Sequence, residues 1–238
     1  MKLQFKRFGL ALRRKRDNLR YKSSRRERQG RHDFFNCAFK ALAFNGIDGD
    51  YAEFGSHGAL TFSQAFHEAT RHKHNARLWA FDSFQGLPTA SMEKDEHPMW
   101  VGGEMATSLS EFHTLCRLRG IDNNRYNVVP GYFNESLPAL GDSADPNNIC
   151  LAYVDCDLYS STMDVLKFLL PRLKHGMIVA FDDYHCWSAT TVSGERLAML
   201  EVFSPQSRWQ LTPYMNIGWH GASFIVEDTA LIMAEQRS

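Results

Sequence analysis

The chain has 238 residues, of which 44% are hydrophobic and 23% charged, values that predict one large, globular, soluble α/β domain. No apolar run approaches the roughly 20 residues that a membrane span needs, so we expect none. The five cysteines are odd in number and lack a CxxC pair, which argues against a disulfide framework or a structural zinc site and fits a reducing, cytoplasmic compartment.

The net charge of zero hides an uneven distribution of charge. Residues 1–31 contain 13 Lys and Arg but only two acidic residues, so this segment carries +11 and the rest of the chain carries −11. We therefore divide the chain into a basic N-terminal arm, 1–31, and one folded domain, 32–238. The arm resembles an organelle transit peptide in composition, and its charge could bind nucleic acid or an acidic membrane. We favour a solvated or partly helical arm, docked on the acidic body of its own or a partner subunit.

Hydrophobic periodicity and turn residues predict helices and strands in alternation. The segment 83–107, after the second strand, is rich in glycine and proline and is long enough to be a functional lid. The predicted helices span 32–45, 60–71, 109–119, 134–140, 160–173 and 193–203, and the predicted strands span 50–54, 77–81, 126–129, 151–154, 177–181, 209–214 and 218–226.

This order of elements indicates an α/β fold with a doubly wound, mostly parallel sheet. The last two predicted strands follow one another without a helix and alternate in polarity, as an antiparallel pair does. Such a pair is unlike the end of a dinucleotide dehydrogenase. It suits a seven-stranded, Rossmann-like sheet whose last strand runs antiparallel to the rest.

A glycine-containing turn follows the first strand and includes Glu53, Gly55, Ser56 and Gly58. Glycines let the backbone approach a ligand and turn sharply into a helix. The spacing lacks the third glycine that the GxGxxG pattern uses for a pyrophosphate, and an acid at the strand end would repel a phosphate. The turn therefore favours a ligand with a cationic end, such as S-adenosylmethionine, over NAD, although a glycine turn after a strand is also a common structural feature.

Two more turns add candidate binding residues. Asp82 ends the second strand, where an acid can accept hydrogen bonds from both ribose hydroxyls or, alternatively, cap a helix. Gly131, after the third strand, allows close approach of the backbone, and an aromatic side chain at Tyr132 or Phe133 could cover an adenine face. Core packing explains Phe133 equally well. Taken together with the glycine turn, these residues favour nucleoside binding.

Acidic residues stand at the ends of two consecutive predicted strands. Asp155 and Asp157 follow the fourth strand, and Asp182 and Asp183 follow the fifth. Single aspartates at strand ends are often caps or turn formers. If these strands are parallel neighbours, however, the carboxylates converge, and a hard divalent cation relieves their repulsion. Such a cation could bind and orient a substrate hydroxyl while one carboxylate takes its proton. Methyl transfer to oxygen by in-line attack fits this arrangement.

Three segments, in order, resemble signatures of the macrocin O-methyltransferase family, which includes the mycinamicin and novobiocin sugar methyltransferases. Residues 82–88 read DSFQGLP, residues 154–162 read VDCDLYSST against the family's DGDLYEST, and residues 181–184 read FDDY. The resemblance extends from about Tyr51 to Tyr184. It implies a class I methyltransferase fold over 32–238, S-adenosylmethionine as methyl donor, a magnesium-type ion, and a sugar or similar hydroxyl as acceptor.

The motifs and the resemblance together give the candidate site residues. The resemblance implies that Asp155 or Asp157 serves as the catalytic base. It also implies that Asp155, Asp182 and Asp183 hold the metal. The candidate cofactor-binding residues are Glu53, Gly55, Ser56, Gly58, Asp82, Ser83, Gly131, Tyr132 and Phe133.

The leading hypothesis is a metal-dependent O-methyltransferase that acts on a small hydroxylated molecule, a sugar or a glycosylated metabolite. A second hypothesis has a larger acidic acceptor, RNA or a glycan, recruited by residues 1–31, which would give steeply salt-dependent binding. A third is a catalytically silent methyltransferase-like domain that serves as a binding partner. The intact acids at both strand ends speak against the third. A homo-oligomer is compatible with all three.

Overall fold

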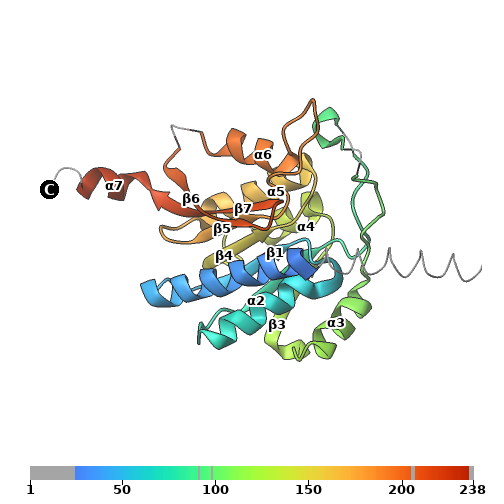
Figure 1. Ribbon diagram of the computed structural model, residues 1–238, viewed down its shortest axis with the longest axis horizontal. Helices are drawn as coiled ribbons and strands as arrows, with labels where there is room; N and C mark the ends of the chain where they lie inside the picture. The colour runs from blue at the N-terminus through green and yellow to red at the C-terminus, as the bar shows by residue number, and fades with distance from the viewer. Residues whose placement is uncertain (1–24, 91, 98, 205–206, 236–238) are drawn as a thin grey trace, which may run out of the picture.

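The computed structural model describes residues 25–90, 92–97, 99–204 and 207–235. Seven strands pair into one sheet in the order β3-β2-β1-β4-β5-β7-β6 (Figure 1). Strands β1 to β5 are parallel, and β7 is antiparallel to both β5 and β6, which confirms the predicted doubly wound sheet with an antiparallel last strand. The strands are β1 Asp50–Phe54, β2 Leu78–Asp82, β3 Tyr126–Pro130, β4 Ile149–Val154, β5 Ile178–Phe181, β6 Trp209–Ile217 and β7 Gly221–Asp228.

Helices cover both faces of the sheet. The helix that includes 25–45 lies with α2 and α3 on one face, and α4, α5 and α6 lie on the other (Figure 1). The predicted helices are confirmed to within a few residues at their ends, except that the first begins by residue 25 instead of residue 32; α7 was not predicted. The helices are α2 Leu60–Arg71, α3 Leu109–Leu118, α4 Phe133–Leu140, α5 Tyr159–Leu169, α6 Gly194–Val202 and α7 Thr229–Glu235, with short 3-10 turns η1 His57–Ala59, η2 Glu93–Asp95, η3 Asn123–Arg125 and η4 Leu170–Arg172.

Aromatic packing fixes helix 25–45 to the sheet. Phe34 and Phe35 are fully buried, and the Phe35 ring centroid lies 5.1 Å from that of Tyr153 on β4. Burying an aromatic side chain stabilises a fold by a few kcal/mol, so this helix is part of the core. The predicted boundary at residue 31 falls inside it, and residues 1–24 of the predicted basic arm lie outside the described residues.

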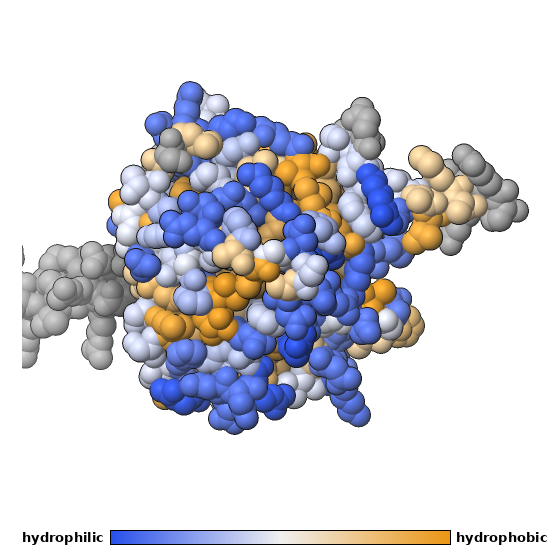
Figure 2. Space-filling view, turned by 180° about the vertical axis from the view of Figure 1, so that it is seen from behind, coloured by the Kyte–Doolittle hydropathy of each residue, from blue (hydrophilic) through white to orange (hydrophobic). Residues whose placement is uncertain are grey.

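The surface mixes polar and apolar residues. On the face seen in Figure 2, hydrophilic residues dominate and apolar patches lie between them. Helix α7 projects from the body (Figure 1) and leaves Leu231 and Met233 largely exposed. Among the described residues, no helix has both the length and the apolar character that crossing a membrane requires.

Glu53, next to last in β1, is a fully buried carboxyl group. It accepts hydrogen bonds from the hydroxyl groups of Tyr51 and of Thr61 on α2, the latter at 3.0 Å. Burial raises the pKa of Glu53 to about 8, although these hydrogen bonds act to lower it. The buried side chain is therefore mostly a neutral acid at pH 7.

This raised pKa makes stability depend on pH. The unfolded chain ionises Glu53 near pH 4.5 and the folded chain only near pH 8, so its contribution to the free energy of unfolding falls as the pH rises between these values. Glu53→Gln keeps the neutral form at every pH. We expect the stability of this variant relative to wild type to increase from pH 5 to pH 8 in urea titrations, by up to about 1.4 kcal/mol per unit of pKa shift. The exposed Glu111→Gln is the control, and a pH-independent difference for Glu53→Gln would contradict the prediction.

Candidate active site

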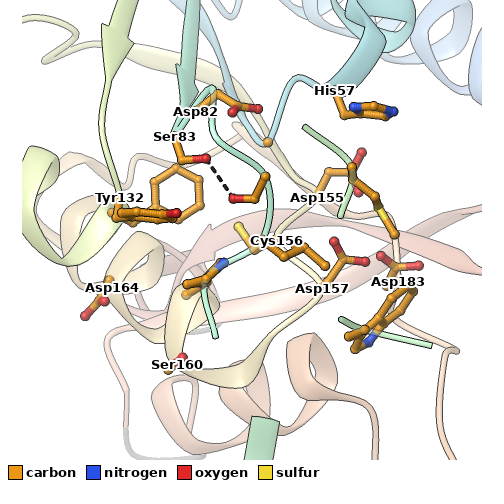
Figure 3. Close-up of a pocket in the computed structure, with 18 of the residues that line it drawn as sticks. His57, Asp82, Ser83, Tyr132, Asp155, Cys156, Asp157, Ser160, Asp164 and Asp183 are labelled. Atoms are coloured by element: carbon orange, nitrogen blue, oxygen red, sulfur yellow. Dashed lines mark hydrogen bonds between the residues drawn. The ribbon is translucent and has the colours of Figure 1, made fainter. Parts of the chain in front are cut away.

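A cavity of about 910 Å³ opens at the carboxyl ends of the parallel strands. Figure 3 shows Asp82, Ser83 and Tyr132 on one side of it and Asp155, Asp157 and Asp183 on the other. Ligands of open α/β sheets bind at this edge. Of the candidate residues, those that line the cavity are Gly55, Asp82, Ser83, Tyr132, Phe133, Asp155, Asp157, Asp182 and Asp183, whereas Glu53, Ser56, Gly58 and Gly131 are absent from the lining.

The turn after β1 brings the two sides of the cavity together. Gly55 has a positive φ of 92°, and a Cβ there would lie only 1.9 Å from the backbone oxygen of Asp155. No other residue type fits at that distance, so the glycine is required by the close approach of two strand ends. Two other candidate residues hold this turn in place through their backbone. The Ser56 N–H donates to the carboxylate of Asp82, and the Gly58 N–H donates to the hydroxyl of Thr107.

Asp82 joins two loops through its carboxylate. One oxygen accepts the N–H of Ser56 and the other accepts the N–H of Phe84, each at 2.6 Å. Burial raises the pKa of Asp82 above its ordinary value, against the lowering effect of these two bonds. Each carboxylate oxygen can accept a second hydrogen bond, so Asp82 can hold the loops and still receive hydroxyl groups from a ligand. The Ser83 hydroxyl donates to the carbonyl of Gly86 at 2.8 Å and steadies the following turn (Figure 3).

The turn after β3 forms an aromatic wall. The Gly131 N–H donates to the backbone oxygen of Asp82 at 3.0 Å, which ties this turn to the end of β2. Tyr132 and Phe133 follow and line the cavity, and Phe133 also packs edge-on against Phe54 of the core, with ring centroids 6.2 Å apart. Phe133 therefore belongs to both the core and the pocket.

Three carboxylates converge opposite this wall. One oxygen of each of Asp155, Asp157 and Asp183 lies within 4.8 Å of the others. Burial raises the pKa of Asp155 and of Asp157, and the neighbouring aspartates raise both further. Asp157 also has a positive φ of 60°, an uncommon conformation for a residue other than glycine. A set of partly buried carboxylate oxygens at this spacing fits a hard divalent cation.

Asp182 is engaged differently from its neighbours. One oxygen accepts from Arg31 Nε at 2.9 Å and from the Tyr153 hydroxyl, and the other accepts from a second Arg31 nitrogen. Burial acts to raise the pKa of Asp182, but Arg31, together with His220 and Tyr153, holds the pKa below its ordinary value. Asp182 also lies in a second group of possible ligands with Asp183 and His220. The resemblance implies that Asp182 is a metal ligand. Because Asp182 is paired with Arg31, the carboxylate of Asp157 is more available to a cation than that of Asp182.

Arg31 and Glu195 contribute to the site although the sequence did not point to either. Arg31 lies in a run of basic residues and reaches the cavity from helix 25–45. Glu195, on α6, is fully buried and accepts the N–H groups of Cys156 at 3.0 Å and Asp183 at 2.8 Å. Burial, and next the charge of Asp183, raises the pKa of Glu195 well above its ordinary value. No local motif marks such long-range partners.

Comparison with known proteins finds relatives among methyltransferases of natural products. The 8-demethyl-8-(2,3-dimethoxy-alpha-L-rhamnosyl)-tetracenomycin-C 4'-O-methyltransferase of Streptomyces olivaceus is 32% identical over 160 residues, 62% of this chain and 57% of that protein. The mycinamicin III 3''-O-methyltransferase of Micromonospora griseorubida is 29% identical over 160 residues, 63% of this chain and 60% of that protein. The chain thus spans less than two thirds of the length of these relatives.

Solved structures share the fold. The O-methyltransferase NovP superposes with a TM-score of 0.69 at 22% identity, over 82% of this chain and 79% of that one. The calicheamicin methyltransferase CalS11 gives a TM-score of 0.63 at 23% identity, over 82% and 77%. A family model described as macrocin-O-methyltransferase (TylF) matches residues 26–200, most of the chain and all three motif segments. The chain therefore belongs to the macrocin-O-methyltransferase (TylF) family.

Proposed function

We propose that this protein transfers the methyl group of S-adenosylmethionine to a hydroxyl of a small molecule, a sugar or a glycosylated metabolite. The observation that carries the proposal is the single cavity that joins the Asp82 and Tyr132 wall to the Asp155, Asp157 and Asp183 cluster. A donor and an acceptor bound there would meet beside Gly55. The named relatives, which methylate sugar-bearing natural products, support the same class of acceptor.

The residues after β1, β2 and β3 form the proposed donor half. When bound, S-adenosylmethionine supplies an electrophilic methyl group. Gly55 lets the ends of β1 and β4 come together beside the donor site. Asp82 would accept from the ribose hydroxyls of the donor, and Tyr132 would pack on its adenine. The buried Glu53 acts from behind the turn, where its contacts with Tyr51 and Thr61 fix the end of β1. Binding of donor and acceptor side by side in one cavity would itself contribute to the rate, because it would orient the two reactants.

The aspartates after β4 and β5 form the proposed acceptor half. Asp155, Asp157 and Asp183 would hold a divalent cation, which supplies Lewis acidity and lowers the pKa of a bound hydroxyl. Asp155 and Asp157 are the candidate bases. Both line the cavity where the acceptor hydroxyl would lie, so either carboxylate could take its proton.

The charge of the cavity favours a neutral acceptor. Besides Asp82, the lining includes Asp164 and the four aspartates at the ends of β4 and β5, whereas Arg31 and Lys167 are its only Lys or Arg side chains among the described residues. Arg31 is paired with Asp182, and Lys167 lies 3.4 Å from Asp164. A polyanion such as RNA would meet an excess of negative charge here, so we favour a small, neutral, hydroxylated molecule.

The first test concerns the donor. Asp82→Ala should weaken the binding of S-adenosylmethionine at least about tenfold, or about 1.4 kcal/mol, because it removes the ribose acceptor and loosens both loops. Isothermal titration calorimetry with the full chain measures the affinity. Asp122→Ala, an exposed aspartate away from the cavity, should bind like wild type. If wild type binds no donor at millimolar concentration, the proposed activity is wrong.

The second test concerns the cation. Asp183→Asn should weaken Mn²⁺ binding roughly 10–100-fold, because an amide is a poorer ligand than a carboxylate, and should leave donor binding nearly unchanged. A chelator should abolish methyl transfer by wild type, and Mg²⁺ should restore it. Asp122→Asn serves as the control. Full activity of chelator-treated protein would refute metal dependence while leaving the donor result intact.

The third test separates the two candidate bases. The variant that removes the base should lose kcat by roughly 10²–10⁴-fold even when Mn²⁺ and donor are saturating. A variant that removes only a ligand should lose Mn²⁺ affinity first and recover activity at high Mn²⁺. Comparing Asp155→Asn with Asp157→Asn in single-turnover assays assigns the roles. Near-normal kcat in both variants would exclude both as bases.

A further inference from the structure

The N-terminal turn of α6 contacts both loops that carry the acid cluster. Ser193 caps the helix by accepting the N–H of Arg196, and it donates its hydroxyl hydrogen to the carbonyl of Tyr184, beyond β5. Gly194 lies against the other loop, since a Cβ there would lie 2.8 Å from both the backbone oxygen of Asp157 and the backbone nitrogen of Tyr159. The first turn of α6 therefore lies between the loops that follow β4 and β5 and contacts both.

Glu195, the next residue, bridges the same two loops with its carboxylate. The regular hydrogen bonds at the ends of these strands finish with the N–H of Asp155, which donates to Phe54, and the N–H of Asp182, which donates to Val154. The next N–H groups along the chain belong to Cys156 and Asp183, and each donates to one oxygen of Glu195. Its carboxylate therefore replaces the carbonyls that a longer sheet would have provided.

Glu195 links the two loops at the place where repulsion between their carboxylates would push them apart. Asp155 and Asp157 on one loop face Asp183 on the other, with ligand oxygens within 4.8 Å. Like charges at this distance in a buried site repel one another. Since both oxygens of Glu195 belong to one rigid, fully buried group, the backbones of Cys156 and Asp183 cannot move apart without breaking a hydrogen bond. Each such bond in a buried site is costly to break.

We propose that Glu195 is a positioning residue for the cation site: it holds the loops after β4 and β5 at the spacing that lets Asp155, Asp157 and Asp183 bind one divalent ion. The inference rests on the proposed function, because it assumes that these carboxylates bind a cation. Glu195 is absent from the cavity lining and acts only through the backbone of the two loops. Its role is thereby distinct from that of the ligands and of the base.

Two substitutions test the bridge. In Glu195→Gln, one carboxylate oxygen becomes an NH₂ group that faces an N–H donor, so one of the two bonds is lost. In Glu195→Asp, the charge remains but the side chain is one methylene shorter and cannot reach both loops. Each variant should weaken Mn²⁺ binding by the full chain at least about tenfold in calorimetry, as loss of groups that orient ligands does. The affinity for S-adenosylmethionine, whose proposed residues lie after β1, β2 and β3, should stay near that of wild type.

The control is Glu201→Gln, on the same helix, whose carboxylate contacts Lys94 and Tyr159 instead of the two loops. It should bind Mn²⁺ like wild type. Wild-type Mn²⁺ affinity in Glu195→Gln would overturn the proposal, and so would wild-type affinity in Glu195→Asp, because the charge alone would then suffice. If Glu195→Gln does not fold, Glu195→Asp, which keeps the buried charge, carries the test alone: wild-type Mn²⁺ affinity in that variant would refute the proposal.

The measurements also separate this inference from the proposed function. Wild-type protein that binds S-adenosylmethionine but no Mn²⁺ would refute the cation site and the role of Glu195 together. Wild-type protein that binds both ligands, with Glu195 variants that also bind both, would refute only the role of Glu195. Failure of wild type to bind S-adenosylmethionine would refute the proposed methyl transfer whatever the Mn²⁺ results show.

Discussion

Electrostatic repulsion among buried carboxylates is the constraint on which the site depends. The parallel arrangement of β4 and β5 places four aspartates at one edge of the sheet, where burial strengthens every interaction between them. The chain meets this repulsion in several ways. Arg31 neutralises Asp182, Glu195 ties the backbones of the two loops, and the remaining carboxylates are left in an arrangement that suits a cation.

The two halves of the cavity are joined by backbone as well as by proximity. Gly55 lies against the carbonyl of Asp155, so the turn that would meet the methyl donor touches the strand end that begins the acid cluster. Asp82 adds a second connection, because its carboxylate holds the same turn through Ser56. A shift of either strand end would therefore alter the distance between the proposed donor and acceptor, on which in-line methyl transfer depends.

The sequence predicted the fold and the residues that the strand ends contribute to the cavity because those features are local. Short apolar runs that alternate with helical segments define β1 to β5. The acids and glycines of the site, such as Gly55, Asp82 and Asp155, directly follow or end these strands. Arg31 and Glu195 could not be predicted in this way. Their partners lie 151 residues and up to 39 residues away in the chain, and nothing in a basic run or at the start of an amphipathic helix reveals which buried group it will meet. The same limit applies to Asp182, whose pairing with Arg31 only the three-dimensional arrangement reveals.

The ion pair between Arg31 and Asp182 also bears on how the protein is made. It links a helix near the N-terminus to the end of β5 and closes a loop of most of the chain. Contacts of such high sequence separation form late, because the entropy of the intervening chain must be lost first. During synthesis, Arg31 emerges from the ribosome long before Asp182, so the ion pair cannot form until β5 has been made. The proposed cation site would therefore be complete only after β5 has joined the sheet.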